Sequence, residues 1–274
     1  IGKKDLIVLD IGGTTAKCAL VENGQVKITT NYKIDHSRTQ AGYPIQTPVI
    51  DIVEIGNGGG SIAWIDEGSK LHVGPKSSGA MPGPAAYGRG GLNLTTTDAN
   101  IITGRIHPDY FLGGELQPDY KNIEKAAQVL CKQLKGSKED IAKGIIRIAN
   151  ANMINALKLI SVNKGYDPRD FTMIVIGGGG AMHGADLARE LQVAELIIPP
   201  HAGVFSAFGM LMSDIRRDYI RTNVLTLSEH QKNVILTTFD EMKKEAISNF
   251  EADNTASENI KFTYYTDLRY AGQE

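Results

Sequence analysis

The sequence predicts an α/β domain built on a mixed sheet, with glycine-rich hairpins and flanking helices. Residues 6–20 form an apolar run that two glycines and two threonines interrupt and that Asn23-Gly24 closes, a pattern typical of a β-hairpin. Residues 56–61 place a glycine-rich loop between two strand-like runs, and residues 171–191 have the pattern of a strand, glycines and a helix. Together these three stretches predict the α/β class.

The turn of the first hairpin, Gly12-Gly13-Thr14-Thr15, is a candidate phosphate site. Its backbone N–H groups and two hydroxyls lie at the tip of a rigid hairpin, where they match the oxygens of a phosphate. Asp10 ends the first strand beside them. Its carboxylate is placed to position a Mg²⁺ ion or the water around it, since a carboxylate directly against phosphate would repel it. The alternative is an ordinary glycine hairpin.

Composition excludes several classes of protein. The chain has 274 residues, 42% of them hydrophobic, which is enough for one large or two modest domains with a buried core. Its 29 basic and 31 acidic residues give a net charge of −2 without a basic run, so neither nucleic acid nor an anionic membrane is favoured as a partner. Two cysteines, Cys18 and Cys131, are too few for a disulfide framework or a zinc site, which favours a reduced, cytoplasmic protein. No stretch is expected to be long and apolar enough to span a bilayer.

The second glycine-rich stretch lies between the strands predicted at residues 49–55 and 62–65, and contains Gly58, Gly59, Gly60 and Ser61. Its spacing is close to a dinucleotide-binding fingerprint, but no helix follows the glycines, so we reject that interpretation. A strand, glycines and a second strand instead indicate backbone that closely approaches a ligand or another backbone.

Residues 71–105 are rich in glycine and proline, yet they lack the charge and low complexity of a disordered linker. We expect an ordered loop over a site, because long ordered loops in compact domains are usually functional. Asp98 within it is either a helix N-cap or a catalytic carboxylate. Arg89 and Arg105 either pair with a carboxylate or phosphate or remain solvated at the surface.

A third glycine-rich turn, Gly177 to Gly180, follows the strand predicted at residues 171–176 and precedes a helix near residues 185–191. Glycines leave no side chain to block a flat ring or a ribose, and a helix N-terminus favours anions. Two interpretations fit this turn: an adenosine site, or close packing of a helix on a strand. His183 at its mouth is either a general acid/base or a capping or packing residue.

The remaining segments are mainly helical. Helices are expected at residues 121–134, 139–163 and 228–251, a helix start at 201–212, and short strands at 194–198 and 261–269. Asn150, Asn152 and Asn155 lie within the second of these helices, where asparagine is a poor helix former. They either hydrogen-bond a neighbour or ligand, or lie on an exposed face.

The hairpin turn has a known counterpart. Residues 10–15 (DIGGTT) resemble a phosphate hairpin of the superfamily that contains actin, sugar kinases and heat-shock chaperone ATPases. Those proteins use two such hairpins, one in each half of a clefted molecule, and this sequence contains one. In the same superfamily the element that resembles residues 171–191 holds adenosine.

A more specific resemblance covers nearly the whole chain. Residues 51–64 (DIVEIGNGGGSIAW) and 73–91 (VGPKSSGAMPGPAAYGRGG) look like the signature of the hydantoinase A, 5-oxoprolinase and acetone carboxylase β-subunit family. The chain departs from that pattern at Lys17 and Met81, where many relatives carry an acid, and at Ala86, where many carry a cysteine. The charge of Lys17 is placed to contact phosphate instead of holding metal.

This resemblance implies an actin-like ATPase (ribonuclease H-like) domain over residues 1–274. It implies a piece of a longer chain without its N-terminal half, and we also expect an inserted subdomain over about residues 66–135. The implied function is that of an ATP-dependent amidohydrolase subunit, which opens a cyclic amide of the hydantoin or 5-oxoproline type by carbonyl phosphorylation. ATP and Mg²⁺ would be its cofactors and a hydantoinase B-type subunit its partner, and the isolated fragment is expected to be inactive. Two alternatives remain: a subunit of an ATP-dependent ketone carboxylase, and a non-catalytic nucleotide-binding or assembly module.

The expected site combines these residues. The catalytic candidates are Asp10, Asp98 and His183, and Asp10 is also the expected metal ligand. The residues expected to contact the nucleotide are Gly12, Gly13, Thr14, Thr15, Lys17, Gly58, Gly59, Gly60, Ser61, Gly177, Gly178, Gly179 and Gly180.

Overall fold

The structure, a computed structural model, describes residues 2–30, 32–34, 40–45 and 48–272. The chain divides into two compact units, residues 1–213 and 214–274. In the described ranges, ten strands precede the first α-helix: β1 (Leu6–Ile11), β2 (Ala16–Glu22), β3 (Gln25–Val26), β4 (Ile28–Thr29), β5 (Tyr32–Ile34), β6 (Tyr43–Ile45), β7 (Val49–Ile50), β8 (Ile52–Ile55), β9 (Ser61–Ile65) and β10 (Leu71–Ser77). The elements that follow in the first unit are η1 (Ala85–Tyr87), α1 (Thr96–Ile102), η2 (Pro108–Gly114), α2 (Tyr120–Leu134), α3 (Lys138–Ile160), η3 (Val162–Lys164), η4 (Pro168–Asp170), β11 (Thr172–Ile176), α4 (Gly180–Leu191), β12 (Glu195–Ile197), η5 (Ala202–Val204) and α5 (Phe205–Leu211).

A mixed sheet forms the centre of the first unit. Its strand order is β12-β11-β1-β2-β3, and β8 also pairs with β2. Strands β1 and β2 are antiparallel, whereas β11 runs parallel to both β1 and β12. Parallel neighbours end at the same edge of a sheet, so Asp10, the next-to-last residue of β1, lies beside Ile176 at the end of β11.

The predicted first hairpin is confirmed. Ile7, Leu9 and Ile11 are buried while the residues between them are only half-buried, which is the period-2 pattern of a strand with one face in the core. The turn at its far end is also confirmed, since Asn23 and Gly24 both have positive φ, as a two-residue hairpin turn requires.

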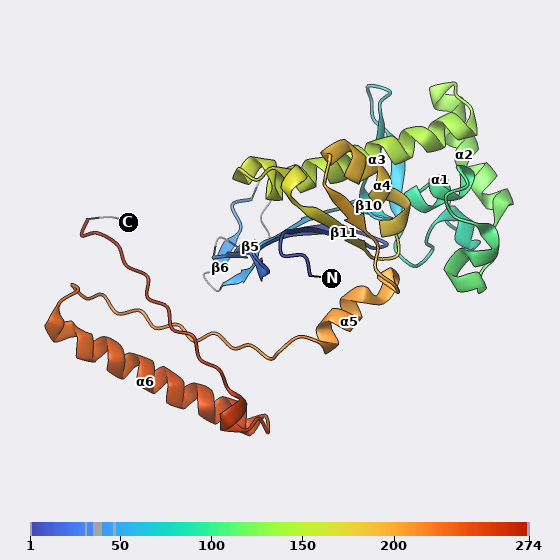
Figure 1. The fold of residues 1–274 in the computed structure, drawn as a ribbon. Coiled ribbons are helices and arrows are strands. Elements are labelled where there is room, and N and C mark those ends of the chain that lie inside the picture. Colours follow the sequence, from blue (N-terminus) through green and yellow to red (C-terminus); the bar gives the residue numbers. More distant parts are fainter. Residues whose placement is uncertain (1, 31, 35–39, 46–47, 273–274) are drawn as a thin grey trace. The chain divides into compact units, whose positions relative to one another are not determined.

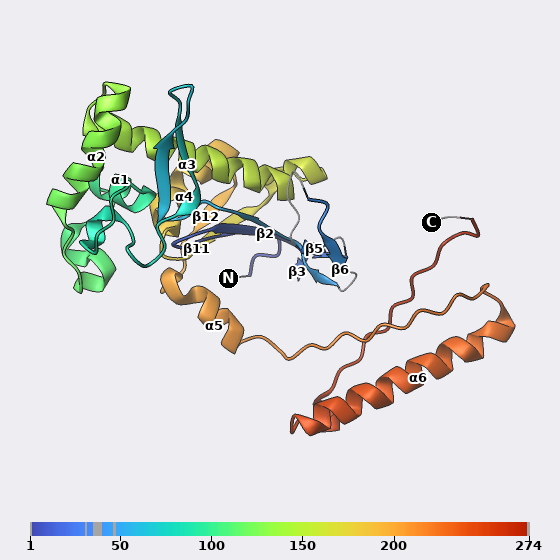
Figure 2. The same ribbon diagram turned by 180° about the vertical axis from the view of Figure 1, so that it is seen from behind.

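Helix α3 is the main core helix, and α4 covers the same face of the sheet (Figures 1 and 2). By length and composition, Lys138–Lys164 would qualify as a membrane-spanning helix, with a mean hydropathy of 1.2, contrary to the expectation that no stretch would. Within the fold, however, 56% of the apolar 18-residue stretch of this helix is buried. Helix α3 contacts β2, β8, β10, α1, α2 and α4. Packing in the core therefore accounts for its apolar residues.

The glycine- and proline-rich segment 71–105 is ordered, as expected, but much of it is regular structure. It begins with β10, which pairs with β9, and ends with α1. Asp98 is not the N-cap of that helix. Thr95 is the N-cap, and Asp98 is the third helical residue of a capping box, so the helix starts at Thr96.

Other expectations were shifted or wrong. The helix expected near residues 185–191 starts earlier, at Gly180, the last glycine of the turn, with Gly179 as its N-cap. The strand expected at 49–55 is divided at Asp51 into β7 and β8, and β3 to β6 in the mixed polar segment before it were not expected. In the described part of residues 214–274 no strand forms at 261–269, where no neighbouring strand offers hydrogen bonds.

The second unit is built around one long helix. This helix is α6 (Glu229–Ala252), followed by η6 (Ser257–Asn259). Extended segments lie against α6: Arg217 pairs with Asp253, and the rings of Phe239 and Tyr264 are 5.1 Å apart. Among the described residues of this unit, only Ala246 and Phe250 are buried apolar residues. The expected inserted subdomain at about 66–135 stays a prediction.

Candidate functional site

The turn between β1 and β2 presents an open backbone surface. It is closed by a hydrogen bond from the Gly12 N–H to the Thr15 carbonyl (3.0 Å), and Gly13 and Thr14 at its tip are exposed. No described atom lies within 4 Å of the position that a Cβ on Gly13 would take. A phosphate-sized group therefore has room to approach the tip of this turn.

The glycine-rich loop after β8 supports the turn from behind. Gly59 N–H donates to the Gly12 carbonyl (2.9 Å) and Gly60 N–H to the Gly13 carbonyl (2.6 Å). A Cβ on Gly58 would lie 2.6 Å from the Gly12 oxygen, so only glycine allows this approach. Gly58 N–H donates to Ser61 Oγ (2.8 Å) inside the core. Of the two interpretations left open for this loop, the structure shows the contact with another backbone.

Asp10 lies where three elements meet. Ser206 in α5 donates a hydrogen bond from Oγ to Asp10 Oδ2 (2.7 Å). A Cβ on Gly177, which has a φ of +83°, would lie 2.3 Å from Asp10 Oδ1, so this turn passes directly against the carboxylate. Ser206 was not singled out from the sequence, because nothing local marks it and its partner is 196 residues away.

Asp10 is also the candidate metal ligand. Within the described ranges, no group of three or more His, Cys, Asp or Glu side chains could hold a metal ion by itself. A Mg²⁺ ion that arrives with a nucleotide takes one or two protein carboxylates and keeps waters and phosphate oxygens as its other ligands. A single carboxylate beside an open backbone turn fits that chemistry.

The turn at Gly177 to Gly180 combines packing with an open position. Gly179 N–H donates to the Ile11 carbonyl (2.8 Å), and a Cβ on Gly179 would lie 2.7 Å from Ile11 Cγ2. A Cβ on Gly180 would lie 2.9 Å from Val175 Cγ1. Gly178 differs, since no described atom lies within 4 Å of its Cβ position. The helix is thus packed closely on the strand, and Gly178 alone leaves backbone open for a ligand.

Lys17 lies opposite Asp10 in the β1–β2 pairing. Its ammonium is 3.7 Å from Glu54 Oε1, and both side chains are half exposed. An ion pair this exposed contributes little to stability. Lys17 therefore has a partner on β8, which leaves its expected contact with phosphate as a prediction.

Asp98 is buried beneath the loop that follows β10. Its carboxylate accepts hydrogen bonds from the backbone N–H groups of Ala85 (3.2 Å), Ala86 (2.8 Å) and Thr95 (2.8 Å), and from Thr95 Oγ1 (2.7 Å). Burial raises the pKa of Asp98, and the hydrogen bonds from Thr95, Ala86 and Ala85 oppose that rise. The carboxylate thus fixes the loop to the start of α1.

His183 lies in the first turns of α4 and is only 2% exposed. Its Nδ1 is 2.7 Å from Asn150 Oδ1, and its Nε2 is 3.3 Å from Asn100 Nδ2. A neutral imidazole that carries its proton on Nδ1 satisfies both contacts. Burial, with a smaller effect from the charge of Arg105, lowers the pKa of His183 to about 4. His183 therefore joins α4 to α1 and α3 as a neutral residue.

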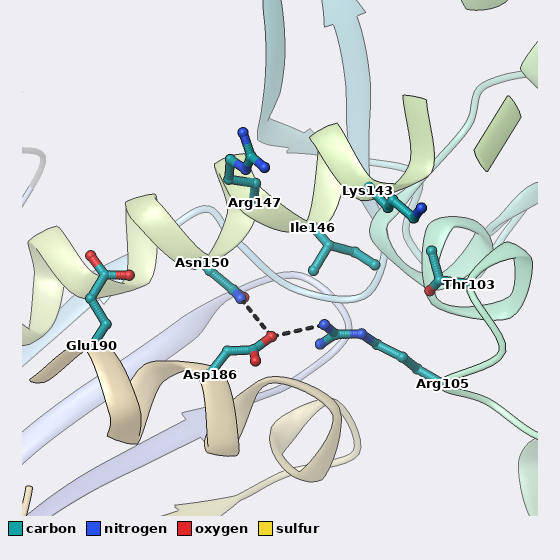
Figure 3. A pocket seen from close by; sticks show the side chains of 8 residues that line it. All are labelled: Thr103, Arg105, Lys143, Ile146, Arg147, Asn150, Asp186 and Glu190. Carbon is teal, nitrogen blue, oxygen red and sulfur yellow. Dashed lines mark hydrogen bonds and ion pairs between the residues drawn. The ribbon is translucent and has the colours of Figure 1, made fainter. Parts of the chain in front are cut away.

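Asp186 continues this network at the surface (Figure 3). It accepts hydrogen bonds from Arg105 (2.8 Å) and Asn150 (3.4 Å), and Arg105 also donates to the Met182 carbonyl (2.7 Å). Around it lies an open pocket of about 440 Å³, which Lys143 and Glu190 also line. Of the choices left open for Arg105, the structure shows pairing with a carboxylate.

The mixed sheet and its flanking helices have the fold of an actin-like ATPase domain. The Hydantoinase/oxoprolinase family matches residues 1–219, and the chain belongs to this family. It is 42% identical over 274 residues to an uncharacterized protein of Methanocaldococcus jannaschii, covering 98% of this chain and 40% of that one. It is 34% identical over 276 residues to caprolactamase subunit alpha of Pseudomonas jessenii, covering 99% of this chain and 39% of that one.

A solved structure shares the fold. A nucleotide-free acetone carboxylase, from work on ATP-dependent acetone carboxylation, superposes with a TM-score of 0.76 at 26% identity, over 94% of this chain and 37% of that one. The chain spans about 40% of the length of these relatives.

Proposed function

We propose that this chain supplies one wall of an ATP site in an enzyme that activates a carbonyl group by phosphorylation, with a small cyclic amide as the substrate. The observation that carries the proposal is the open turn at Gly13 and Thr14, held by a second glycine loop and flanked by Asp10. Two relatives support it: caprolactamase subunit alpha, and the acetone carboxylase whose carboxylation of acetone is ATP-dependent.

Each part of the turn has a role in this proposal. The backbone N–H groups at the tip of the turn, on Gly13 and Thr14, and the hydroxyls of Thr14 and Thr15 bind phosphate oxygens of ATP, and Gly178 leaves room for the adenosine. Asp10 holds Mg²⁺ or its water shell, with Ser206 fixing the carboxylate in one orientation. When bound, Mg²⁺ neutralises charge on the phosphates.

The reaction would proceed by phosphoryl transfer. The amide oxygen attacks the γ-phosphorus of ATP, so a new O–P bond forms, the bond from that phosphorus to the β–γ bridging oxygen breaks, and ADP leaves. Water then adds to the activated carbon, the C–N bond breaks, and the amine nitrogen takes a proton, which leaves an acyl phosphate. A second water releases inorganic phosphate and the carboxylate. The protein's contribution to the first step is positioning and electrostatic stabilisation.

A ketone carboxylase subunit is the second candidate. The chain is 31% identical to an acetophenone carboxylase gamma subunit of Aromatoleum aromaticum, over 282 residues. Both candidates require substrate-stimulated ATP hydrolysis, but only the carboxylase requires bicarbonate. A hydantoinase B-type partner belongs to the proposal, since two of these relatives are themselves subunits.

Mg·ATP binding tests the proposal, measured by calorimetry on this chain and on a longer polypeptide that contains it. We expect weak binding and no turnover by this chain alone, and tight binding by the longer polypeptide, because one wall of the cleft is insufficient. ATP hydrolysis is then assayed with 5-oxoproline, hydantoin and caprolactam, and with acetone plus bicarbonate. No binding by either polypeptide would contradict the proposal and leave the chain as an assembly module.

A further inference from the structure

We infer that the loop after β10 forms the pocket that receives the small amide substrate, beside the phosphate turn. This inference rests on the proposed function and deepens it. The pocket, here the loop pocket, has a volume of about 300 Å³. The residues that line it and carry the argument are Lys76, Ser77, Ser78, Met81, Leu92 and Asn93.

The loop pocket adjoins the turn that would hold the phosphates. Ser77 Oγ, Ser78 Oγ and the Gly13 carbonyl oxygen all lie within 3.1 Å of the position that a Cβ on Gly60 would take. Ser78 is fixed there, since its N–H and its hydroxyl both hydrogen-bond the Gly60 carbonyl (2.9 and 3.2 Å). Two hydroxyls of the pocket lining are therefore close to the backbone of the phosphate turn, where the carbonyl oxygen must meet the γ-phosphate.

The lining matches a small amide. Lys76 is its one charged side chain among the described lining residues, and Ser77, Ser78 and Asn93 add hydrogen-bonding groups. Met81 and Leu92 give an apolar side for ring methylenes. Its volume is at the lower end of the range of small-molecule sites, which likewise combine apolar side chains with a few convergent polar groups. With a cation and no carboxylate, it favours a neutral or anionic amide over a cationic one.

Buried groups hold this loop in one shape. Asp98 accepts from the N–H groups of Ala85 and Ala86, and Asn122 donates from Nδ2 to the carbonyls of Ala85 and Gly91 (2.9 Å each). A Cβ on Gly91 would lie 2.4 Å from the carbonyl oxygen of Gly83, so the loop packs backbone to backbone at these two residues. The pocket is therefore preformed, which lowers the entropic cost of binding.

A first test fills the pocket in the full-length enzyme with its partner subunit. Leu92 is 77% exposed at the pocket and Leu159 is 47% exposed on α3, so Leu92→Trp and Leu159→Trp make the same change at the pocket and away from it. We expect Leu92→Trp to raise the KM for the accepted amide about tenfold or more, a loss of about 1.4 kcal/mol, and to leave the KM for ATP within about twofold. Equal amide KM values for the two variants would overturn the inference.

A second test needs no turnover. Leu92→Cys and Leu159→Cys are alkylated with N-ethylmaleimide in the presence of Mg·ATP and each of 5-oxoproline, hydantoin and caprolactam. Native Cys131, which is half-buried, is replaced by serine in both variants. Native Cys18 reacts slowly, because it is 2% exposed and burial raises its thiol pKa to about 12. We expect one of the three amides to slow alkylation at position 92 at least about threefold and not at position 159.

The outcomes separate the two proposals. If Mg·ATP binds normally and none of the amides protects position 92, the loop pocket is not the substrate site, although the ATP site stands. If Mg·ATP does not bind to the wild-type enzyme, the proposed function itself fails.

Discussion

At the scale of single residues, His183 shows how burial decides between two chemical roles. A general acid/base must reach a substrate and titrate near the working pH. His183 is enclosed by Asn100 and Asn150, and its pKa is lowered to about 4. The imidazole is therefore better suited to hold α4 against α1 and α3 than to transfer protons, and we propose this positioning role for it.

This state of His183 predicts a pH dependence of stability. The unfolded chain takes up a proton near pH 6.5 and the native chain only near pH 4, so stability is complete above pH 6.5 and falls as the pH decreases between these values. Each pKa unit corresponds to about 1.4 kcal/mol, so the free energy of unfolding should decrease by about 3 kcal/mol between pH 6.5 and pH 4. Urea unfolding from pH 7 to pH 4 should show this decrease in wild type and a smaller one in His183→Gln.

The exposed His107 supplies the control. His107→Gln should keep the wild-type pH dependence between pH 4 and pH 7. An unchanged slope in His183→Gln would show that His183 does not titrate with a lowered pKa in the native state.

At the scale of elements, the first hairpin depends on the two segments packed against it. The loop containing Gly58, Gly59 and Gly60 hydrogen-bonds the turn, and Gly179 hydrogen-bonds Ile11. Most of these glycines are needed because another backbone or side chain occupies the space of a Cβ. Gly13 and Gly178 differ, since the space beside them is open.

Gly58→Ala and Gly178→Ala separate these two kinds of glycine. A methyl group on Gly58 would meet the Gly12 carbonyl oxygen at 2.6 Å, so we expect a loss of about 1–3 kcal/mol in the free energy of unfolding. Gly178→Ala should stay within about 1 kcal/mol of wild type. Denaturant unfolding of both variants measures this, and equal stabilities would contradict the tight contact at Gly58.

Helix α5 reaches the same turn through Ser206. Removing its hydroxyl frees the Asp10 carboxylate to rotate, so Ser206→Ala should weaken Mg²⁺-dependent ATP binding at least about tenfold, since one hydrogen bond to a charged group contributes about 1.5–3 kcal/mol. Ser213, whose hydroxyl donates only to the Gly209 carbonyl, supplies the matched control Ser213→Ala. ATP titrations at several Mg²⁺ concentrations should show a changed Mg²⁺ requirement in the first variant only.

Hydrophobic periodicity and glycine clusters predicted the hairpin, its turn, the strand before Gly177 and the long helices. These signals depend only on residues that are neighbours in the sequence, as these elements do. It did not identify Ser206 or Asn122 as parts of the site. Ser206 is 196 residues from Asp10, and Asn122 is 37 and 31 residues from the carbonyls it binds. The strand expected at 261–269 failed for a related reason, since a strand also depends on a partner elsewhere in the chain.

At the scale of the whole molecule, the described residues contain one candidate phosphate turn, and the chain spans about 40% of the length of the Methanocaldococcus and caprolactamase relatives. The first unit holds the turn, the glycine loops and the loop pocket, whereas the second unit contains none of these. We therefore expect a complete ATP site only when the rest of the polypeptide supplies the opposite wall of the cleft.

The central claim is that the turn between β1 and β2 binds phosphate. The most direct test compares the Mg·ATP affinity of the full-length polypeptide for wild type, Gly13→Ala and Gly209→Ala. No described atom lies within 4 Å of either Cβ position, so both variants should fold with wild-type stability. If phosphate binds at the turn, the methyl group on residue 13 occupies its place, and affinity should fall at least about tenfold in Gly13→Ala and not in Gly209→Ala. Wild-type affinity in a folded Gly13→Ala variant would contradict a phosphate site at this turn.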